Sequence, residues 1–291
     1  MSCSYFVRRR HLVQKRNPLL ISLLSLLLTA PLWGQTRGIV TFGGLKNLEF
    51  VNNYYNGGTG SMGSGPAKNL HLEFTANAEA IVSADKGGSG NFINNPGGYP
   101  VMFFPTGSSV TINTTAGVTT GLWFTYSALQ PGAATLYDGP NGTGNILSSI
   151  SLTSNESGCT TYKMCVWTPV GVPLSTPVAS IRFSGVANYI AVGAIHLGVK
   201  LPTSTILTSS QNPSVVGESV TFTAAVSATG AAPVGTVTFK TGNTIVGQIP
   251  VVAGSASIAL SSLPAGSTRI SAIFRGNGFV TSTANVIQVV N

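Results

Sequence analysis

Side chains able to perform acid–base or metal chemistry are sparse in this sequence. Beyond residue 34 the chain has two histidines, His71 and His196, and seven carboxylates. No paired-histidine or His-x-Glu-x-His spacing occurs, so the pattern gives a zinc site little support. Glu73 and Glu79 could serve as glycosidase carboxylates, which act about 5–10 Å apart. His71 and Glu73 alternate with apolar neighbours, however, and an exposed polar strand face explains them better.

Two aspartates stand where a hard cation could bind. Asp85 precedes a glycine-rich stretch, and Asp138 lies in Asp-Gly-Pro-Asn-Gly. The side chain of an aspartate beside glycine most often hydrogen-bonds to the nearby backbone and stabilises a turn. That interpretation is preferred for both aspartates. Calcium held by Asp85 or Asp138 together with loop carbonyls is the alternative, because calcium takes oxygen ligands from such loops. Calcium is the single cofactor that the sequence suggests.

Aromatic side chains in loops offer a second kind of site. Tyr54, Tyr55 and Tyr99 lie in glycine-rich stretches, where exposed rings could stack on sugar faces. In the alternating stretch 121–126, Trp123 lies on the face opposite Leu122, Phe124 and Tyr126. Since one face of that strand must be core, only part of the set can reach a ligand. Tyr54, Tyr55, Tyr99 and Trp123 are the predicted binding residues.

The elements that would position these residues follow from composition. Charged residues make up 8% of the chain, and glycine occurs 35 times. Such a chain, rich in β-branched and turn residues, favours short strands joined by tight turns. We expect an all-β fold: strands recur at sandwich spacing through 36–200, and the long linkers 52–68 and 85–99 between them should be functional or mobile.

The first 34 residues have the pattern of an export signal. A basic segment ends at Arg16, an apolar run covers 19–28, and Thr29–Gly34 forms the exit. The run is shorter than the roughly 20 residues that span a bilayer, so a cleaved signal peptide is preferred over an uncleaved anchor. Five of the 15 Lys and Arg residues lie in this segment, which leaves ten against seven Asp and Glu. No basic stripe remains, so nucleic-acid binding is not expected.

Export affects how the cysteines are interpreted. Cys3 lies in the signal peptide, whereas Cys159 and Cys165 follow it. Two cysteines this close in an exported protein most simply form one disulfide that closes a small loop. Metal ligation is the alternative, but no histidine or second cysteine pair lies nearby. We predict a Cys159–Cys165 disulfide that holds a loop in place.

The first part contains four glycine- and asparagine-bearing segments: Tyr54–Gly60, Asp85–Phe92, Tyr137–Gly144 and Phe183–Asn188. Together they resemble exported bacterial proteins that often carry a PEP-CTERM sorting tail, and the resemblance covers most of 38–198. It implies a jelly-roll-like β-sandwich, similar in plan to carbohydrate-binding modules, without an established activity. Two departures from the pattern matter: the C-terminal sorting tail is missing, and Gly193-Ala194 stands where such domains often have an acidic pair. A calcium site built on that pair would be lost.

The last third alternates strictly. Val220, Phe222, Ala224 and Val226 fall on one face of a strand, as in a half-buried antiparallel sheet. With Gly235–Phe239 and Leu263–Ser267, the region 203–291 resembles the bacterial Ig-like repeat of surface proteins and adhesins. The resemblance implies an Ig-like β-sandwich that usually serves as a spacer or adhesive module. The predicted domains are thus a signal peptide (1–34), a jelly-roll-like sandwich (36–200) and an Ig-like sandwich (203–291).

These expectations lead to three function hypotheses. The preferred one is an exported, non-catalytic protein of the cell surface or extracellular matrix, with an adhesive or structural role. The first alternative is a carbohydrate-binding protein that uses the Gly/Tyr-rich loops, and the second is a weak extracellular hydrolase. The expected partners are surface or matrix polysaccharides or proteins. We expect no nucleic acid, and no membrane span once the signal is removed.

Overall fold

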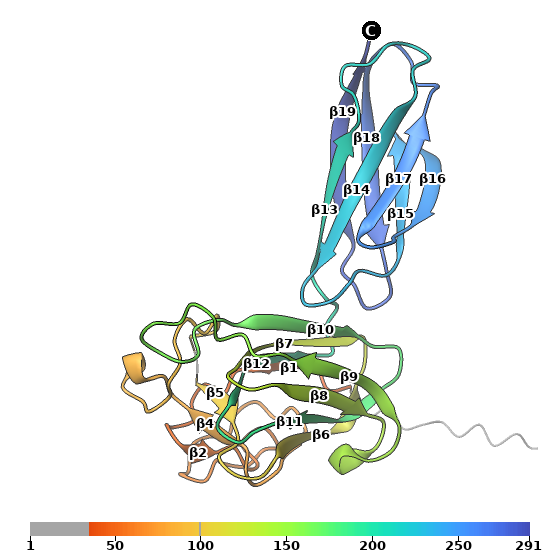
Figure 1. Cartoon of the computed structure of the whole chain (residues 1–291). Helices are drawn as coiled ribbons and strands as arrows, with labels where there is room; N and C mark the ends of the chain where they lie inside the picture. Colours follow the sequence, from red (N-terminus) through yellow and green to blue (C-terminus); the bar gives the residue numbers. More distant parts are fainter. Residues whose placement is uncertain (1–34, 99) are drawn as a thin grey trace, which may run out of the picture. The chain divides into compact units, whose positions relative to one another are not determined.

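The chain is all-β. Its structure, a computed structural model, describes residues 35–98 and 100–291. In this part of the chain, regular structure consists of strands and two short 3₁₀ helices (Figure 1). The all-β prediction is therefore confirmed. The predicted signal peptide, residues 1–34, lies outside the described residues.

The first sandwich contains twelve strands and both 3₁₀ helices. They are β1 (Gly38–Val40), β2 (Glu49–Phe50), β3 (Leu72–Phe74), β4 (Glu79–Ile81), η1 (Ala84–Lys86), β5 (Val101–Phe103), β6 (Ser109–Val118), β7 (Gly121–Ala128), β8 (Gly132–Tyr137), η2 (Pro140–Gly142), β9 (Ile146–Leu152), β10 (Thr168–Pro173), β11 (Val178–Ser184) and β12 (Ile190–Leu197).

The strand order of this sandwich is that of a jelly roll. One sheet runs β10-β7-β12-β5-β4-β2, with β1 also paired to β12, and the other runs β3-β6-β11-β8-β9. The eight strands from β5 to β12 therefore divide between the two sheets in the order 5-12-7-10 and 6-11-8-9, which is that of two Greek keys. The jelly-roll-like prediction is confirmed. β2 and β4 extend one sheet beyond β5, β3 extends the other beyond β6, and β1 pairs with β12.

Alternation places the core between these sheets. Leu122, Phe124 and Tyr126 on β7 are buried, as the period of two predicts. Phe124 meets Phe183 of the opposite sheet edge to face, with ring centroids 5.1 Å apart. This geometry suits the aromatic quadrupoles and fixes the spacing of the two layers.

One strand of this sandwich, β10, has a sequence that does not by itself indicate a strand. It contains Pro169, Gly171 and Pro173, which weaken a strand pattern because proline donates no ladder hydrogen bond. Its position explains the exception: β10 pairs only with β7, at the edge of its sheet. Edge strands are where proline is tolerated.

The second sandwich has seven strands. They are β13 (Thr203–Ser209), β14 (Val220–Ala228), β15 (Thr236–Thr241), β16 (Thr244–Pro250), β17 (Ser255–Leu260), β18 (Gly266–Arg275) and β19 (Ser282–Val290). They form the sheets β13-β14-β17 and β16-β15-β18-β19, all antiparallel. This is an Ig-like arrangement, with the fourth strand on the second sheet.

The alternation predicted in β14 is present in the structure. Val220, Phe222, Ala224 and Val226 are buried, whereas Thr221 remains partly exposed. Buried residues of this part form a cluster separate from that of the first sandwich. Two cores agree with two predicted domains, although the domain limits at 200 and 203 stay a prediction. Among the described residues, no helix is long and apolar enough to cross a bilayer.

Candidate functional site

Two loops of the first sandwich are joined backbone to backbone. The Ile93 N–H donates to the Met164 carbonyl at 2.9 Å, and the Met164 N–H donates to the Asn91 carbonyl at 3.2 Å. The Lys163 N–H donates to Asn91 Oδ1 at 2.9 Å. Trp167 adds a fourth bond from its indole N–H to the Ile93 carbonyl at 2.9 Å. The glycine-rich loop that follows β4 and contains Asn91 and Ile93 is therefore held by a segment some 70 residues later.

The disulfide holds that later segment. Cys159 and Cys165 are bonded, with Cα atoms 5.6 Å apart, which confirms the predicted pairing. The bond closes a short loop immediately around Lys163 and Met164, the residues that pair with the glycine-rich loop. The disulfide is predicted to hold a loop in place, and the structure shows that this loop pairs with the segment of Asn91 and Ile93.

Removing the disulfide should destabilise the contact between the two loops more than it destabilises the sandwich core. For Cys159→Ser/Cys165→Ser we expect a stability loss of about 2 kcal/mol, because a loop this short gains modest chain-entropy stabilisation. Hydrogen exchange should rise at the Met164 and Ile93 amides while core β7 and β11 amides keep their protection. Exchange measured by mass spectrometry checks this, and equal protection in both loops with and without the disulfide would contradict it.

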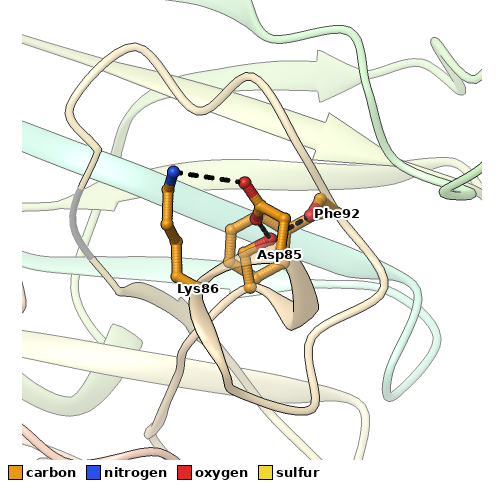
Figure 2. A network of polar contacts seen from close by, with 4 residues as sticks. Asp85, Lys86 and Phe92 are labelled. Atoms are coloured by element: carbon orange, nitrogen blue, oxygen red, sulfur yellow. Dashed lines mark hydrogen bonds and ion pairs between the residues drawn. The ribbon is translucent and has the colours of Figure 1, made fainter.

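A polar network closes the start of the glycine-rich loop (Figure 2). The Ser83 hydroxyl lies within hydrogen-bonding reach of the Asp85 carboxylate and of the Phe92 carbonyl. Lys86 Nζ lies 3.4 Å from Asp85 Oδ2. The Ser83 hydrogen bond, followed by the Lys86 charge, lowers the pKa of Asp85. Asp85 is thus engaged in fixing its own turn.

Two cavities flank Phe92 in this region. The first, about 300 Å³, contains Asp85 and Lys86 on its wall. The second, about 320 Å³, lies where the two joined loops meet the start of β12. An open extension of the second shares Leu129, Lys163 and Tyr189 with it. We call the second cavity with its extension the loop groove.

The loop groove offers both an aromatic ring and polar groups. Tyr189 is 40% exposed and lines both of its parts. Asn91 and Asn188 supply amides, and Lys163 supplies a cation. Glu156 is the carboxylate lining the extension, alongside Gln130. These groups can stack on and hydrogen-bond a hydroxyl-rich ligand.

The predicted tyrosine site in the first loop is wrong. Tyr54 and Tyr55 are 5% and 4% exposed, so their rings cannot stack on a ligand. The rings pack edge to face on each other at 5.0 Å. Each hydroxyl has an internal partner: Tyr54 donates to the Gly43 carbonyl at 2.8 Å, and Tyr55 accepts from the Phe42 N–H at 2.8 Å. Both tyrosines belong to the main core of the first sandwich, where the Tyr55 ring also contacts Phe42 and Phe74.

Trp123 lies on the outer face of the seven-stranded sheet. Its indole stacks on His196 of β12, with ring centroids 3.6 Å apart and planes inclined by 11°. Burial lowers the pKa of His196, which favours its neutral form. One face of the indole is therefore covered by the imidazole, and the structure does not bring Trp123 into the loop groove. Tyr99 lies outside the described residues.

The calcium candidates lie in separate turns. Asp138 follows β8, and Asp85 lies in η1. Asp138 accepts the Asn145 backbone N–H at 2.7 Å and the Asn145 side-chain amide at 2.8 Å, and these bonds lower its pKa. Within residues 35–98 and 100–291, no three His, Cys, Asp or Glu side chains gather into a metal-binding group. Calcium at either aspartate stays a prediction.

The carboxylates considered for hydrolysis are also apart in the fold. Glu73 lies on β3 of the five-stranded sheet, whereas Glu79 lies on β4 of the seven-stranded sheet. Glu73 is exposed and accepts the Asn56 amide at 3.3 Å. Glu79 is buried, and burial raises its pKa. The two side chains belong to different layers, and neither lines the loop groove.

Glu49 is a buried carboxylate that sequence reasoning missed. Its side chain is fully buried and accepts the backbone N–H groups of Lys46, Met62 and Ser64 at 2.7, 2.9 and 3.1 Å. Burial alone raises its pKa, but these hydrogen bonds outweigh it and the net pKa falls below 4.5. Glu49 thus closes the base of the other long loop, residues 52–68, which follows it in the chain.

Comparisons with solved structures give only distant likenesses. The glycoside hydrolase domain of Endo-D from Streptococcus pneumoniae R6 is 13% identical over 87% of this chain and 43% of its own length, with a TM-score of 0.30. Fibronectin(III)-like modules of CbhA from Clostridium thermocellum are 13% identical over 64% of this chain and 87% of theirs, with a TM-score of 0.29. Scores of this size carry no argument about fold or function.

Sequence comparison identifies one part of the chain. No curated protein matches the sequence significantly. The resemblance of the first part to exported PEP-CTERM-type proteins is not confirmed by any match. A bacterial Ig-like domain fits a non-catalytic cell-surface or structural protein. The family described as "Bacterial Ig-like domain (group 3)" matches residues 207–291, so the second sandwich is similar to this family over nearly its whole length.

Proposed function

We propose that this protein is an exported, non-catalytic adhesin of the cell surface or extracellular matrix, and that its loop groove binds a saccharide chain. The predicted export signal, the disulfide and the bacterial Ig-like domain all support an extracellular setting. A jelly roll is a frequent lectin architecture, which is support by analogy of fold alone.

One observation carries the saccharide assignment: an exposed tyrosine stands beside two amides in a preformed groove. A sugar presents an apolar face and a hydroxyl rim. Tyr189 can stack on the face. Asn91 Oδ1 already accepts the Lys163 N–H and Asn188 Nδ2 donates to the Pro105 carbonyl, so the Asn91 NH₂ is the group that can donate to a hydroxyl and the Asn188 Oδ1 the group that can accept from one. The disulfide and the four hydrogen bonds between the loops hold the groove before a ligand arrives, which reduces the ordering cost of binding.

The non-catalytic assignment is supported by the structural interactions in which the carboxylates take part. Glu49 and Asp138 accept backbone hydrogen bonds, and Asp85 pairs with Lys86. In the groove region Glu156 stands without a second lining carboxylate. Glycoside hydrolysis in its usual form needs two carboxylates about 5–10 Å apart across the bond. The proposal therefore requires saccharide binding without cleavage.

The test is a glycan array probed with the mature chain and with Tyr189→Ala. We expect binding to surface or matrix polysaccharides that falls about tenfold in the variant, because truncating a stacking aromatic removes roughly 1–2 kcal/mol. Tyr137→Ala is the matched control, since Tyr137 is partly exposed on the five-stranded sheet and lines neither part of the groove. Parallel assays with calcium and with EDTA test the calcium prediction.

Three results would count against the proposal. Equal loss in the Tyr189 and Tyr137 variants would show that the groove is not the site. Absence of binding to every glycan would remove the saccharide assignment. Release of shorter oligosaccharides from a bound polysaccharide would restore the hydrolase alternative.

A further inference from the structure

The outer face of the four-stranded sheet in the Ig-like sandwich gathers three cations. Residues 269, 271, 273 and 275 of β18 point away from the core, because Ile270, Ala272 and Phe274 between them are fully buried. Arg269 and Arg275 thus lie on the outer face. Lys240 of β15 stands directly opposite Ser271 and joins them. Figure 1 shows β15 beside β18 in this sheet.

The positive charges on this face are uncompensated. Glu218 is the single carboxylate side chain of residues 203–291, and it accepts hydrogen bonds from Gln211 and from the Val215 N–H. Across the described chain, Lys240, Arg269 and Arg275 take part in no ion pair. Arg269 donates to Asn285 at 3.2 Å, which holds its guanidinium over the sheet.

The spacing of the cations suits an extended polymer. Arg269 and Arg275 are six residues apart, or about 20 Å along a strand, and Lys240 lies between them. Hydroxyl and amide side chains of Ser267, Ser271, Thr283 and Asn285 occupy outward positions among them. A chain that carries both negative charges and hydroxyl groups can therefore pair with the cations and hydrogen-bond between them.

The same face lacks the features of a nucleic-acid site. Its outward residues on β15, β18 and β19 include no aromatic side chain on which a base could stack. We propose that this face, the basic face, binds an acidic polysaccharide through Lys240, Arg269 and Arg275. The site is separate from the loop groove and does not depend on it.

The test measures binding of the mature chain to immobilised polygalacturonate, with neutral dextran in parallel. The variant Lys240→Gln/Arg269→Gln/Arg275→Gln should bind polygalacturonate about tenfold more weakly, since each exposed charge pair contributes a modest share. The control Arg37→Gln/Lys68→Gln/Lys200→Gln removes the same net charge from exposed positions elsewhere and should stay within about twofold. Raising salt to about 0.5 M should abolish wild-type binding.

Several outcomes would overturn the basic face. Equal loss in both triple variants would mean that net charge, and not this face, governs binding. Dextran binding as tight as polygalacturonate binding would remove the role of charge, and tighter binding of duplex DNA would reassign the partner. Arg275→Gln alone covers the case in which the triple variant fails to fold, because the Arg275 side chain is exposed and has no hydrogen-bond partner among the described residues. Tyr189→Ala should leave this binding intact, which separates it from the groove proposal.

Discussion

Phe222→Ala is expected to destabilise the Ig-like sandwich by about 3–5 kcal/mol. Phe222 is fully buried on β14, and truncating a buried phenylalanine removes its hydrophobic burial and leaves a cavity. Thr221→Ala is the matched control one residue away: its side chain points to the other face, and its loss should cost less than about 0.5 kcal/mol. The pair tests the period of two directly.

Calorimetry is the suitable measurement for this pair. The Ig-like sandwich contains no tryptophan or tyrosine, so fluorescence reports on the first sandwich through Trp123 and Trp167. A second, lower-temperature transition should separate in the Phe222 variant. Similar small effects for Phe222→Ala and Thr221→Ala would mean that β14 does not present Phe222 to a core.

Glu49→Gln is expected to destabilise the first sandwich by about 3 kcal/mol. The two carboxylate oxygens have different donors: Lys46 N–H on Oε2, and the Met62 and Ser64 N–H groups on Oε1. An amide can replace only one acceptor, so in either orientation its NH₂ faces a backbone N–H and leaves it unsatisfied. Urea unfolding followed by tryptophan fluorescence measures the loss. Glu73→Gln, at an exposed carboxylate, should cost less than about 0.5 kcal/mol.

The same variant has a defined pH signature. Because folding lowers the pKa of Glu49, its ionised form stabilises the fold above pH 4.5, and that stabilisation is lost as the pH falls through the folded-state pKa. The gap between wild type and Glu49→Gln should therefore narrow on acidification below pH 4.5. A gap that stays constant at lower pH would show that Glu49 does not carry a depressed pKa.

The sequence predicted those strands whose burial pattern can be recognised from residues close together in the chain. The alternation of β14 and the composition of the first part indicated strands and a sandwich because burial in a sheet has a period of two. β10 escaped prediction, since Pro169 and Pro173 are permitted only by its edge position. Tyr54 and Tyr55 were misplaced because glycine-rich sequence suggests an open loop, whereas their hydroxyls bond to the backbone of Gly43 and Phe42, about a dozen residues earlier.

Both proposed binding surfaces depend on contacts that sequence alone does not specify. Asn91, Lys163 and Tyr189 meet only because the jelly-roll order places the joined loops beside β12. Lys240 and Arg269 seemed scattered in the chain, and the register of β15 against β18 brings them to one face. Both surfaces are formed by pairing between strands that are dozens of residues apart in the chain. Local periodicity contains no information about that pairing.

The prolines of β10 have a consequence for how copies of this protein could associate with one another. An open sheet edge exposes a row of unpaired N–H and C=O groups that a neighbouring molecule could extend. Pro169 and Pro173 remove two donors from the edge of the seven-stranded sheet. Even at high local concentration, a second copy would therefore form few backbone hydrogen bonds with β10. Aggregation through edge-to-edge pairing of these sheets is disfavoured.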